Sequence, residues 1–269
     1  MAEAPIPQIF AGGVVCTGHE FGLTFTPDMK EGYFTRTFPD KKINHILRTE
    51  FKDGRWQTAI TTSFSDDRWS DLDPSLSPNG KRLFFISTRP ATSQDVGPKD
   101  MDIWYVDRVR NDWGQPRRLD NVNSSAKEGS PAVSREGTLC FFSDRDREAN
   151  SNSIFCSELR EGKYNEPVKL GPEINSEFSD TSPFLSADGN TLLFYSTRPG
   201  GYGKADLYVS FKRNHRWLPA NNLGSIVNTS EWEYNPVISP DGKTLYFGRN
   251  RNIYWLPVSA LRIAGHERF

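Results

Sequence analysis

Short apolar runs alternate with turn residues along this chain, and no stretch before residue 258 keeps a helical period for more than two turns. Residues 180–198 show the pattern clearly: apolar Phe184-Leu185, then Asp188-Gly189, then a second apolar run from Leu192 to Ser196. Glycine adopts positive φ without a steric clash, and aspartate hydrogen-bonds within its own turn. The pattern therefore predicts a β-hairpin whose second strand is buried on both faces.

This hairpin recurs five times. If one anchor residue is taken in the first strand of each copy, the anchors lie 51 to 57 residues apart; they are Leu23, Pro74, Pro131, Pro183 and Pro236. A third strand follows each hairpin, as at residues 206–209, and in most copies a more polar fourth strand follows, as at 217–223. Four short antiparallel strands per repeat of this length are typical of a β-propeller blade. Proline in the fourth strand fits an outer edge, where the missing N–H does no harm.

The fifth copy ends after its third strand, at residues 252–255, but residues 5–17 match the missing fourth-strand pattern. We therefore predict an all-β, five-bladed β-propeller in which an N-terminal strand completes the last blade. A single domain is expected over residues 1–269. Its blades are predicted at about 18–65, 66–124, 125–176, 177–229, and 230–258 together with 5–17.

A family resemblance supports this fold. The string Ser-Pro-(Asp/Asn)-Gly-Lys-x-Leu-(Tyr/Phe)-Phe, at residues 77–85 and 239–247, resembles the WD-repeat-like blade of TolB-type β-propellers, and residues 196–209 strengthen the match. The resemblance covers nearly the whole chain. It implies the propeller fold but not one function, because such blades serve binding modules, periplasmic scaffolds and peptidases. TolB itself has six blades and an extra domain, whereas this chain has room for five blades.

Composition excludes several classes of protein. The net charge is −1 and no long block of like charge occurs, so nucleic-acid binding through a basic surface is not expected. No apolar run approaches the roughly 20 residues that span a bilayer. No cofactor is predicted, and a monomer is expected. Residues 1–5 lack the basic segment and apolar core of a signal peptide. The compartment is left open: periplasmic or extracellular if a leader was removed, and cytoplasmic otherwise, with the resemblance favouring export.

The cysteines and histidines do not predict a metal site. His19, His45, His215 and His266 are scattered without the spacing of a zinc site. Asp95, Asp100 and Asp102 lack the glycine and terminal glutamate of a calcium loop. If Ser143 lies opposite Ser153, Cys140 faces Cys156. A cross-strand disulfide could then form, but such bridges are usually strained, so two buried thiols are the favoured interpretation.

An acid and an arginine recur in every repeat. The acid stands three residues before the anchor and the arginine thirteen to fifteen residues after it; the pairs are Glu20 with Arg36, Asp71 with Arg89, Glu128 with Arg145, Asp180 with Arg198, and Glu233 with Arg249. The start of the first strand lies beside the end of the second, so each acid should meet its arginine. The favoured interpretation is a structural ion pair within or between blades. The alternative is a ring of ten charged groups at the channel mouth that binds a ligand.

Two further features are candidates for ligand binding. Trp232 and Tyr234 flank Glu233, and they could form a platform for a sugar or another flat ligand, or simply pack against the first blade. The loop at residues 90–101 is the longest between a second and a third strand, and it could be a binding loop or a tolerated insertion.

The preferred function is a non-enzymatic binding or scaffold propeller. It would recognise a protein segment or a glycan on the face that carries the charged ring, Trp232 and Tyr234. The alternative is a carbohydrate-active enzyme, a glycoside hydrolase or lyase, that uses Glu128, Asp180 or Glu233 with His19 nearby. A metal-dependent enzyme is the third hypothesis. No Gly-x-Ser-x-Gly motif of a serine hydrolase occurs.

Overall fold

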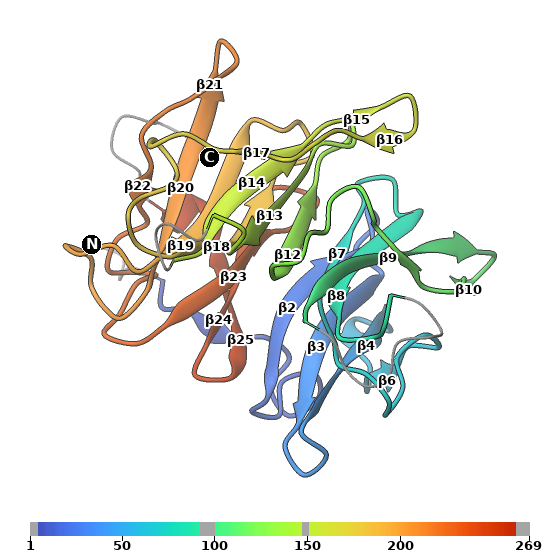
Figure 1. The fold of residues 1–269 in the computed structure, drawn as a ribbon. Coiled ribbons are helices and arrows are strands. Elements are labelled where there is room, and N and C mark those ends of the chain that lie inside the picture. The colour runs from blue at the N-terminus through green and yellow to red at the C-terminus, as the bar shows by residue number, and fades with distance from the viewer. Residues whose placement is uncertain (1–4, 92–99, 147–150, 262–269) are drawn as a thin grey trace.

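Five antiparallel β-sheets are arranged around a common axis in the computed structural model, which describes residues 5–91, 100–146 and 151–261 (Figure 1). Residues of all five sheets line a central channel at this axis. Each sheet contributes an inner strand next to the channel and then a second, a third and an outer strand. The predicted all-β five-bladed propeller is therefore confirmed. Within the described ranges the only helical segment is one 3-10 turn, η2 (Val258–Ala260), and no helix there is long and apolar enough to cross a membrane.

The strands follow the predicted repeat. The inner, second and third strands are β2 (Glu20–Phe25), β3 (Glu31–Phe38) and β4 (Ile43–Lys52) in blade 1; β7 (Asp71–Leu76), β8 (Arg82–Ser87) and β9 (Asp102–Val109) in blade 2; β12 (Glu128–Val133), β13 (Leu139–Ser143) and β14 (Ser153–Ser157) in blade 3; β18 (Asp180–Leu185), β19 (Thr191–Ser196) and β20 (Asp206–Arg213) in blade 4; and β23 (Glu233–Ile238), β24 (Thr244–Arg249) and β25 (Asn252–Pro257) in blade 5.

The outer strands are short. They are β6 (Ile60–Thr61), β11 (Arg117–Arg118), β17 (Val168–Lys169), β22 (Asn221–Asn222) and, for blade 5, β1 (Gln8–Ile9). Three further strands pair with the far ends of the third strands, namely β5 (Arg55–Trp56), β10 (Asp112–Trp113) and β21 (Arg216–Trp217), and a small hairpin joins β15 (Leu159–Arg160) to β16 (Lys163–Tyr164).

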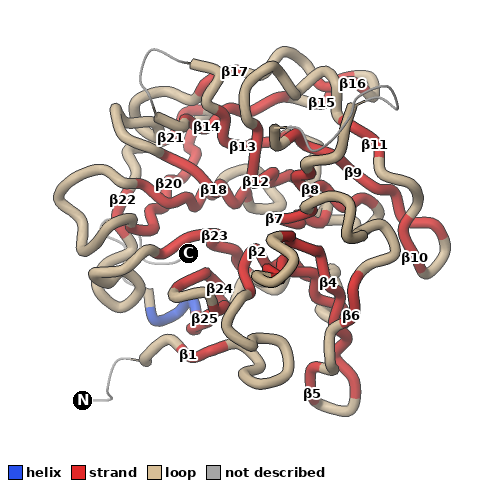
Figure 2. Tube along the Cα trace, turned by 60° about the horizontal axis from the view of Figure 1, so that its bottom comes forward, coloured by secondary structure: helices blue, strands red, loops and turns tan. Residues whose placement is uncertain are grey.

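The N-terminal segment closes the ring as predicted. β1 lies antiparallel to β25, with Gln8 opposite Trp255 and Ile9 opposite Tyr254 (Figure 2). The paired part is shorter than the predicted 5–17 segment, and Phe10 anchors it. Its ring packs edge-to-face against Phe25 of blade 1 and Tyr246 of blade 5. The first and last segments of the chain therefore share one sheet and one apolar cluster.

The hydrophobic core is divided between the five blade-to-blade interfaces. Each of five apolar clusters joins side chains from two adjacent blades. In β8, for example, Leu83 and Phe85 pack towards blade 1, whereas Phe84 and Ile86 pack towards blade 3. Successive side chains of a strand point to opposite faces of its sheet. This is why the central residues of the second strands are apolar on both faces, as the sequence pattern indicated.

The cysteine interpretation needs a correction. The predicted register is confirmed, with Ser143 opposite Ser153 and Cys140 opposite Cys156. The two cysteines form a disulfide rather than the expected pair of buried thiols. Direct cross-strand pairing brings their Cα atoms to 4.0 Å, so the two sulfurs meet between the strands. Cys16 is a free, buried thiol, and burial raises its pKa to about 12.

Candidate functional site

All five predicted acid–arginine ion pairs form. The nitrogen–oxygen distances are 2.6 Å for Arg36–Glu20, 2.7 Å for Arg89–Asp71, 2.9 Å for Arg145–Glu128, 2.7 Å for Arg198–Asp180 and 2.8 Å for Arg249–Glu233. All five acids are fully buried. Charge-assisted hydrogen bonds of this kind are stronger than neutral ones. The favoured structural interpretation of these pairs is therefore confirmed.

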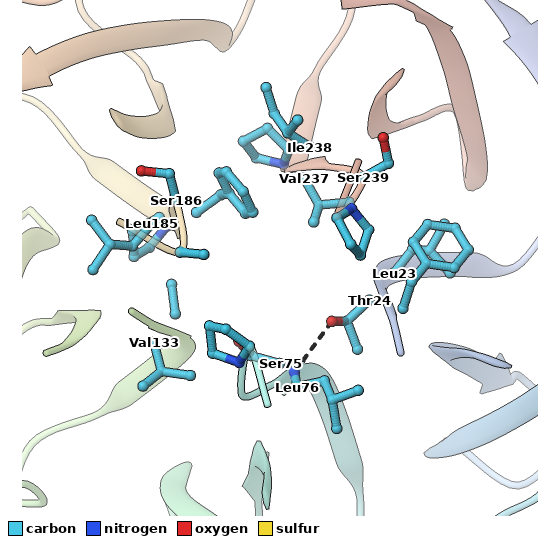
Figure 3. A pocket seen from close by; sticks show the side chains of 18 of the residues that line it. Leu23, Thr24, Ser75, Leu76, Val133, Leu185, Ser186, Val237, Ile238 and Ser239 are labelled. Carbon is cyan, nitrogen blue, oxygen red and sulfur yellow. Dashed lines mark hydrogen bonds between the residues drawn. The ribbon is translucent and has the colours of Figure 1, made fainter. Parts of the chain in front are cut away.

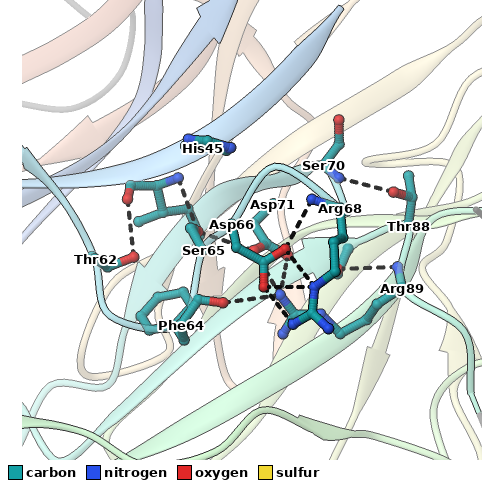
Figure 4. Close-up of polar contacts among 12 residues, drawn as sticks. His45, Thr62, Phe64, Ser65, Asp66, Arg68, Ser70, Asp71, Thr88 and Arg89 are labelled. Carbon is teal, nitrogen blue, oxygen red and sulfur yellow. Dashed lines mark hydrogen bonds and ion pairs between the residues drawn. The ribbon is translucent and has the colours of Figure 1, made fainter. Parts of the chain in front are cut away.

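Each pair also ties its blade to the segment that leaves the blade before it. In blade 2, Arg89 donates to the backbone carbonyl of Phe64, and the hydroxyl of Ser65 donates to Asp71 (Figure 4). The other four pairs repeat this arrangement, with carbonyls of Val15, Val122, Ile174 and Val227 and hydroxyls of Thr17, Ser124, Ser176 and Thr229. We call each five-part unit of acid, arginine, hydroxyl, carbonyl and strand end an interblade latch.

The charged groups of the latches are bonded to one another and lie outside the described lining of the channel. In blade 2, burial raises the pKa of Asp71 to about 6, although Arg89 and Ser65 stabilise its charge. In blade 1, burial also raises the pKa of Glu20, but hydrogen bonds from Thr17, His19 and Arg36 outweigh it and leave that pKa lowered. No acid or arginine of a latch belongs to the described lining of the channel. The ten residues have structural partners, and their assignment as ligand-binding residues stays a prediction.

The channel widens into a cavity on each side. The turn-side mouth has a volume of about 610 Å³ and is lined by the ends of the inner strands and by the tight turns that follow them (Figure 3). Prolines and aliphatic side chains such as Val133, Leu185 and Ile238 dominate it. The loop-side mouth, also about 610 Å³, lies where the inner strands begin. Its lining is more aromatic, with Phe21, Phe142, Tyr195 and Tyr234.

The two mouths meet at a ring of five equivalent residues that we call the waist. It consists of the residue before each anchor: Gly22, Asp73, Ser130, Ser182 and Asn235. All five have positive φ, between 46° and 59°. The register of each inner strand shifts at this place, as a β-bulge does, and a bulge re-aims the side chain that it carries.

Asp73 is the charged member of the waist. The Ser130 hydroxyl donates to one carboxylate oxygen, and the Asn235 amide donates to the other at 3.2 Å. The backbone N–H of Asp73 donates to the Thr35 hydroxyl at 2.9 Å. Asp73 is 8% exposed, and burial raises its pKa to about 6. The sequence carries a signal for this ring, because a small or polar residue stands before every anchor.

The predicted aromatic pair lies at the loop-side mouth. Tyr234 lines the cavity and packs edge-to-face on Phe21 of blade 1, with 6.5 Å between ring centroids. Trp232 is 44% exposed and lies edge-to-face with Tyr195, another lining residue, at 6.3 Å. Both rings therefore pack against neighbouring blades, and Tyr234 also lines the cavity, whereas Trp232 only contacts a lining residue. Their role as a platform for a ligand stays a prediction. Glu233 points away into its latch.

Other predicted candidates are placed as follows. His19 lines the loop-side mouth, whereas His45 is buried 3.4 Å from Asp67, and burial lowers its pKa. Among the residues that the structure describes, no group of three or more histidines, cysteines and acids could hold a metal ion. Residues 92–99 of the predicted binding loop, which include Asp95, lie outside the described residues, as does His266.

Comparison with known proteins supports the fold class. No sequence-family model and no curated protein matches the chain. Solved structures do: TolB from Acinetobacter baumannii has a TM-score of 0.52 and 18% identity, and the match covers 91% of this chain and 55% of TolB. An α-L-arabinofuranosidase from Lactobacillus brevis has a TM-score of 0.56, 12% identity and 92% coverage of both chains. The gluconolactonase XC5397 from Xanthomonas campestris has a TM-score of 0.52, 12% identity, and coverage of 97% and 96%.

These likenesses define the chain as a β-propeller and nothing finer. The chain spans about half the length of the Acinetobacter TolB, so the resemblance to TolB-type blades holds for the propeller alone. The arabinofuranosidase and the gluconolactonase are named for different activities on one architecture, as is common among propellers. Function must therefore be argued from the waist and its two mouths.

Proposed function

We propose that this chain is a non-enzymatic binding propeller that holds a protein segment or a glycan in the loop-side mouth. The composition of that mouth carries the proposal. Four half-buried aromatic rings line a cavity of about 610 Å³ above the polar waist. Ligand sites are typically concave, with apolar and aromatic walls and a few polar groups that fix orientation. Flat rings bind sugar faces and apolar side chains of a peptide equally well.

The carboxylates favour binding over glycoside cleavage. Most glycosidases place two carboxyl groups on either side of the scissile bond. Glu128, Asp180 and Glu233, the alternative catalytic residues, are fully buried in latches. In the described lining of the loop-side mouth the only carboxylate is Asp73. One observation still favours an enzyme as the second candidate, since His19 lines the same cavity as Asp73.

A binding screen with matched variants tests the proposal. Purified protein is applied to glycan and peptide arrays, and hits are quantified by calorimetry for the wild type, Tyr234→Ala and Tyr202→Ala. Tyr202 is an exposed tyrosine outside the described channel lining, so it controls for loss of a ring. Tyr234→Ala should weaken binding about tenfold or more, as removal of a central aromatic contact does, and Tyr202→Ala should not.

Two results would overturn the proposal. If Tyr234→Ala and Tyr202→Ala bound the ligand with equal affinity, the ligand would not bind in the loop-side mouth. Release of a product from any bound glycan, lost in Asp73→Asn while circular dichroism shows an intact fold, would establish the carbohydrate-active enzyme instead.

A further inference from the structure

The waist holds a negative charge that the fold does not neutralise. Asp73 is almost completely buried, yet no arginine, lysine or histidine among the described residues forms an ion pair with it. Ser130 and Asn235 each donate a hydrogen bond to one of its oxygens, but neither side chain carries a positive charge. Burial of an unpaired carboxylate is costly. Asn in this place would keep the shape without that cost, and Asn235 shows that the ring accepts it.

Gly22 allows a close approach of this carboxylate to the first blade. The four other waist residues adopt the same left-handed backbone with a side chain, so backbone conformation does not require glycine there. A Cβ on Gly22 would lie 3.0 Å from Oδ1 of Asp73 and 3.3 Å from its Cα. Such contacts are too close without a shift of the neighbouring strand. The glycine therefore lets Asp73 pack closely against this backbone, and the Asn235 amide of blade 5 donates to Oδ1 of Asp73 in blade 2.

We propose that Asp73 is the specificity-determining residue of the channel and that it receives a protonated amine of the ligand. This inference rests on the proposed binding function, because the amine enters through the loop-side mouth. Both mouths share Asp73, Ser130, Ser182 and Asn235, so a group inserted from the aromatic side reaches the carboxylate at the floor.

The chemistry of the waist matches an ammonium group. An ammonium has three donors and one positive charge. Asp73 supplies one negative charge, and Ser182 and Asn235 add a hydroxyl and an amide oxygen at the same level of the channel. The faces of the aromatic walls attract cations further. A calcium ion would instead need six to eight oxygen ligands, and the described residues contain no cluster of three metal-binding side chains.

Two basic side chains line the same mouth, where a positive charge would oppose an entering amine. His19 and Arg251 both belong to its lining, and Arg251 is exposed to solvent. Water and salt screen an exposed charge far more than a buried one. The attraction of buried Asp73 should therefore dominate once the amine is inside the channel.

The test uses three probes that share one ring: benzylamine, benzyl alcohol and benzoate. Calorimetry measures each at pH 7.5 on the wild type, Asp73→Ser, Asp73→Asn and Asp53→Asn. Ser and Asn occupy equivalent waist positions, so both Asp73 variants should fold. Asp53 is a matched control, an exposed aspartate with the same φ of 52° as Asp73. We expect benzylamine to bind the wild type and Asp53→Asn at least tenfold more tightly than benzyl alcohol, and both Asp73 variants to lose this preference.

The outcomes separate this inference from the proposed function. Glycan or peptide binding that depends on Tyr234, without any preference for benzylamine, would overturn the amine site and leave the binding function standing. Amine binding that depends on Asp73 but not on Tyr234 would support the site and overturn the loop-side mouth. Displacement of benzylamine by sodium or potassium chloride, but not by choline chloride at equal ionic strength, would overturn the amine assignment in favour of an alkali cation.

Discussion

Asp71 and Asp73 lie two residues apart on β7, and both are buried carboxylates whose pKa burial raises to about 6. Asp71 pairs with Arg89 in an interblade latch, and every blade has an equivalent pair. Asp73 faces the channel without an arginine, and its equivalents in the other blades are uncharged. Alternate residues of a strand normally share a face. The bulge after Leu72 and the positive φ of Asp73 redirect the second carboxylate towards the axis.

The difference between Asp71 and Asp73 distinguishes residues that hold the blades together from residues that are specific to one blade. A residue type that occurs in all five repeats serves what the repeats have in common, which is packing of one blade on the next. A residue type that occurs once at a repeated position is not needed for the packing that all blades share. Asp73 meets the second description, because the same place holds glycine, serine or asparagine elsewhere. In a repeat protein, departure from the repeat is therefore the better guide to a binding site.

The largest effect is expected when one latch is opened. Arg89→Ala leaves Asp71 buried without its cation, and its guanidinium also holds the carbonyl of Phe64. Removal of one partner of a buried ion pair costs about 3–5 kcal/mol of the free energy of unfolding. Urea denaturation followed by tryptophan fluorescence measures this change.

Two matched arginines calibrate the result. Arg68→Ala removes an exposed guanidinium that pairs with nearby Asp66, and the melting temperature should stay within error. Arg198→Ala opens a latch whose arginine is more exposed than Arg89, and it should cost about 1–3 kcal/mol. If Arg89→Ala were no more destabilised than Arg68→Ala, the latches would not be the interactions that hold adjacent blades together.

The disulfide sharpens the comparison, because it is unique to one blade and still structural. The pairs at the equivalent register position are Tyr33–Arg48, Phe84–Tyr105, Leu193–Val209 and Tyr246–Trp255. The double variant Cys140→Ser/Cys156→Ser should lower the free energy of unfolding by about 3 kcal/mol, as expected for a closed loop of this length. It should leave binding at the waist unchanged. Loss of binding in this variant would contradict this expectation. It would show that the disulfide, although packed between blades, also affects the binding site at the waist.

Much of this architecture was predictable from the sequence. The hairpin repeat, the closing of the ring by an N-terminal segment within residues 5–17, the cross-strand register of Cys140 and Cys156, and the five ion pairs all follow from spacing and strand alternation. These features are local or repeat fivefold, so each copy supports the others. The waist was not predicted, because a β-bulge breaks the alternation on which the argument depends. The bond between Asp73 and Asn235 joins residues 162 positions apart, and only closure of the ring brings them together.

The smallest expected effect is a change in how the free energy of unfolding depends on pH when Asp73 is replaced and Asp71 is kept. The pKa of Asp73 is raised from 3.8 to about 6, so the folded protein holds this proton more tightly than the unfolded chain does. The resulting stability is fully present below about pH 4 and is lost as pH rises through about 6. Relative to wild type, Asp73→Asn should therefore gain on the order of 1–2 kcal/mol in free energy of unfolding between pH 4 and 7. Asp71 keeps its own dependence in both proteins, so the difference reports Asp73 alone.

An exposed aspartate provides the control of opposite sign. A hydrogen bond from Thr26 lowers the pKa of Asp28, so its stabilising contribution is present above the unfolded pKa and is lost as pH falls. Asp28→Asn should therefore lose stability relative to wild type as pH rises towards about 4, and should show no further slope between about pH 5 and 7. A flat profile for Asp73→Asn over that upper range would mean that its carboxylate is already solvated or paired. The channel would then offer no uncompensated charge to a ligand, and the contrast with Asp71 would disappear.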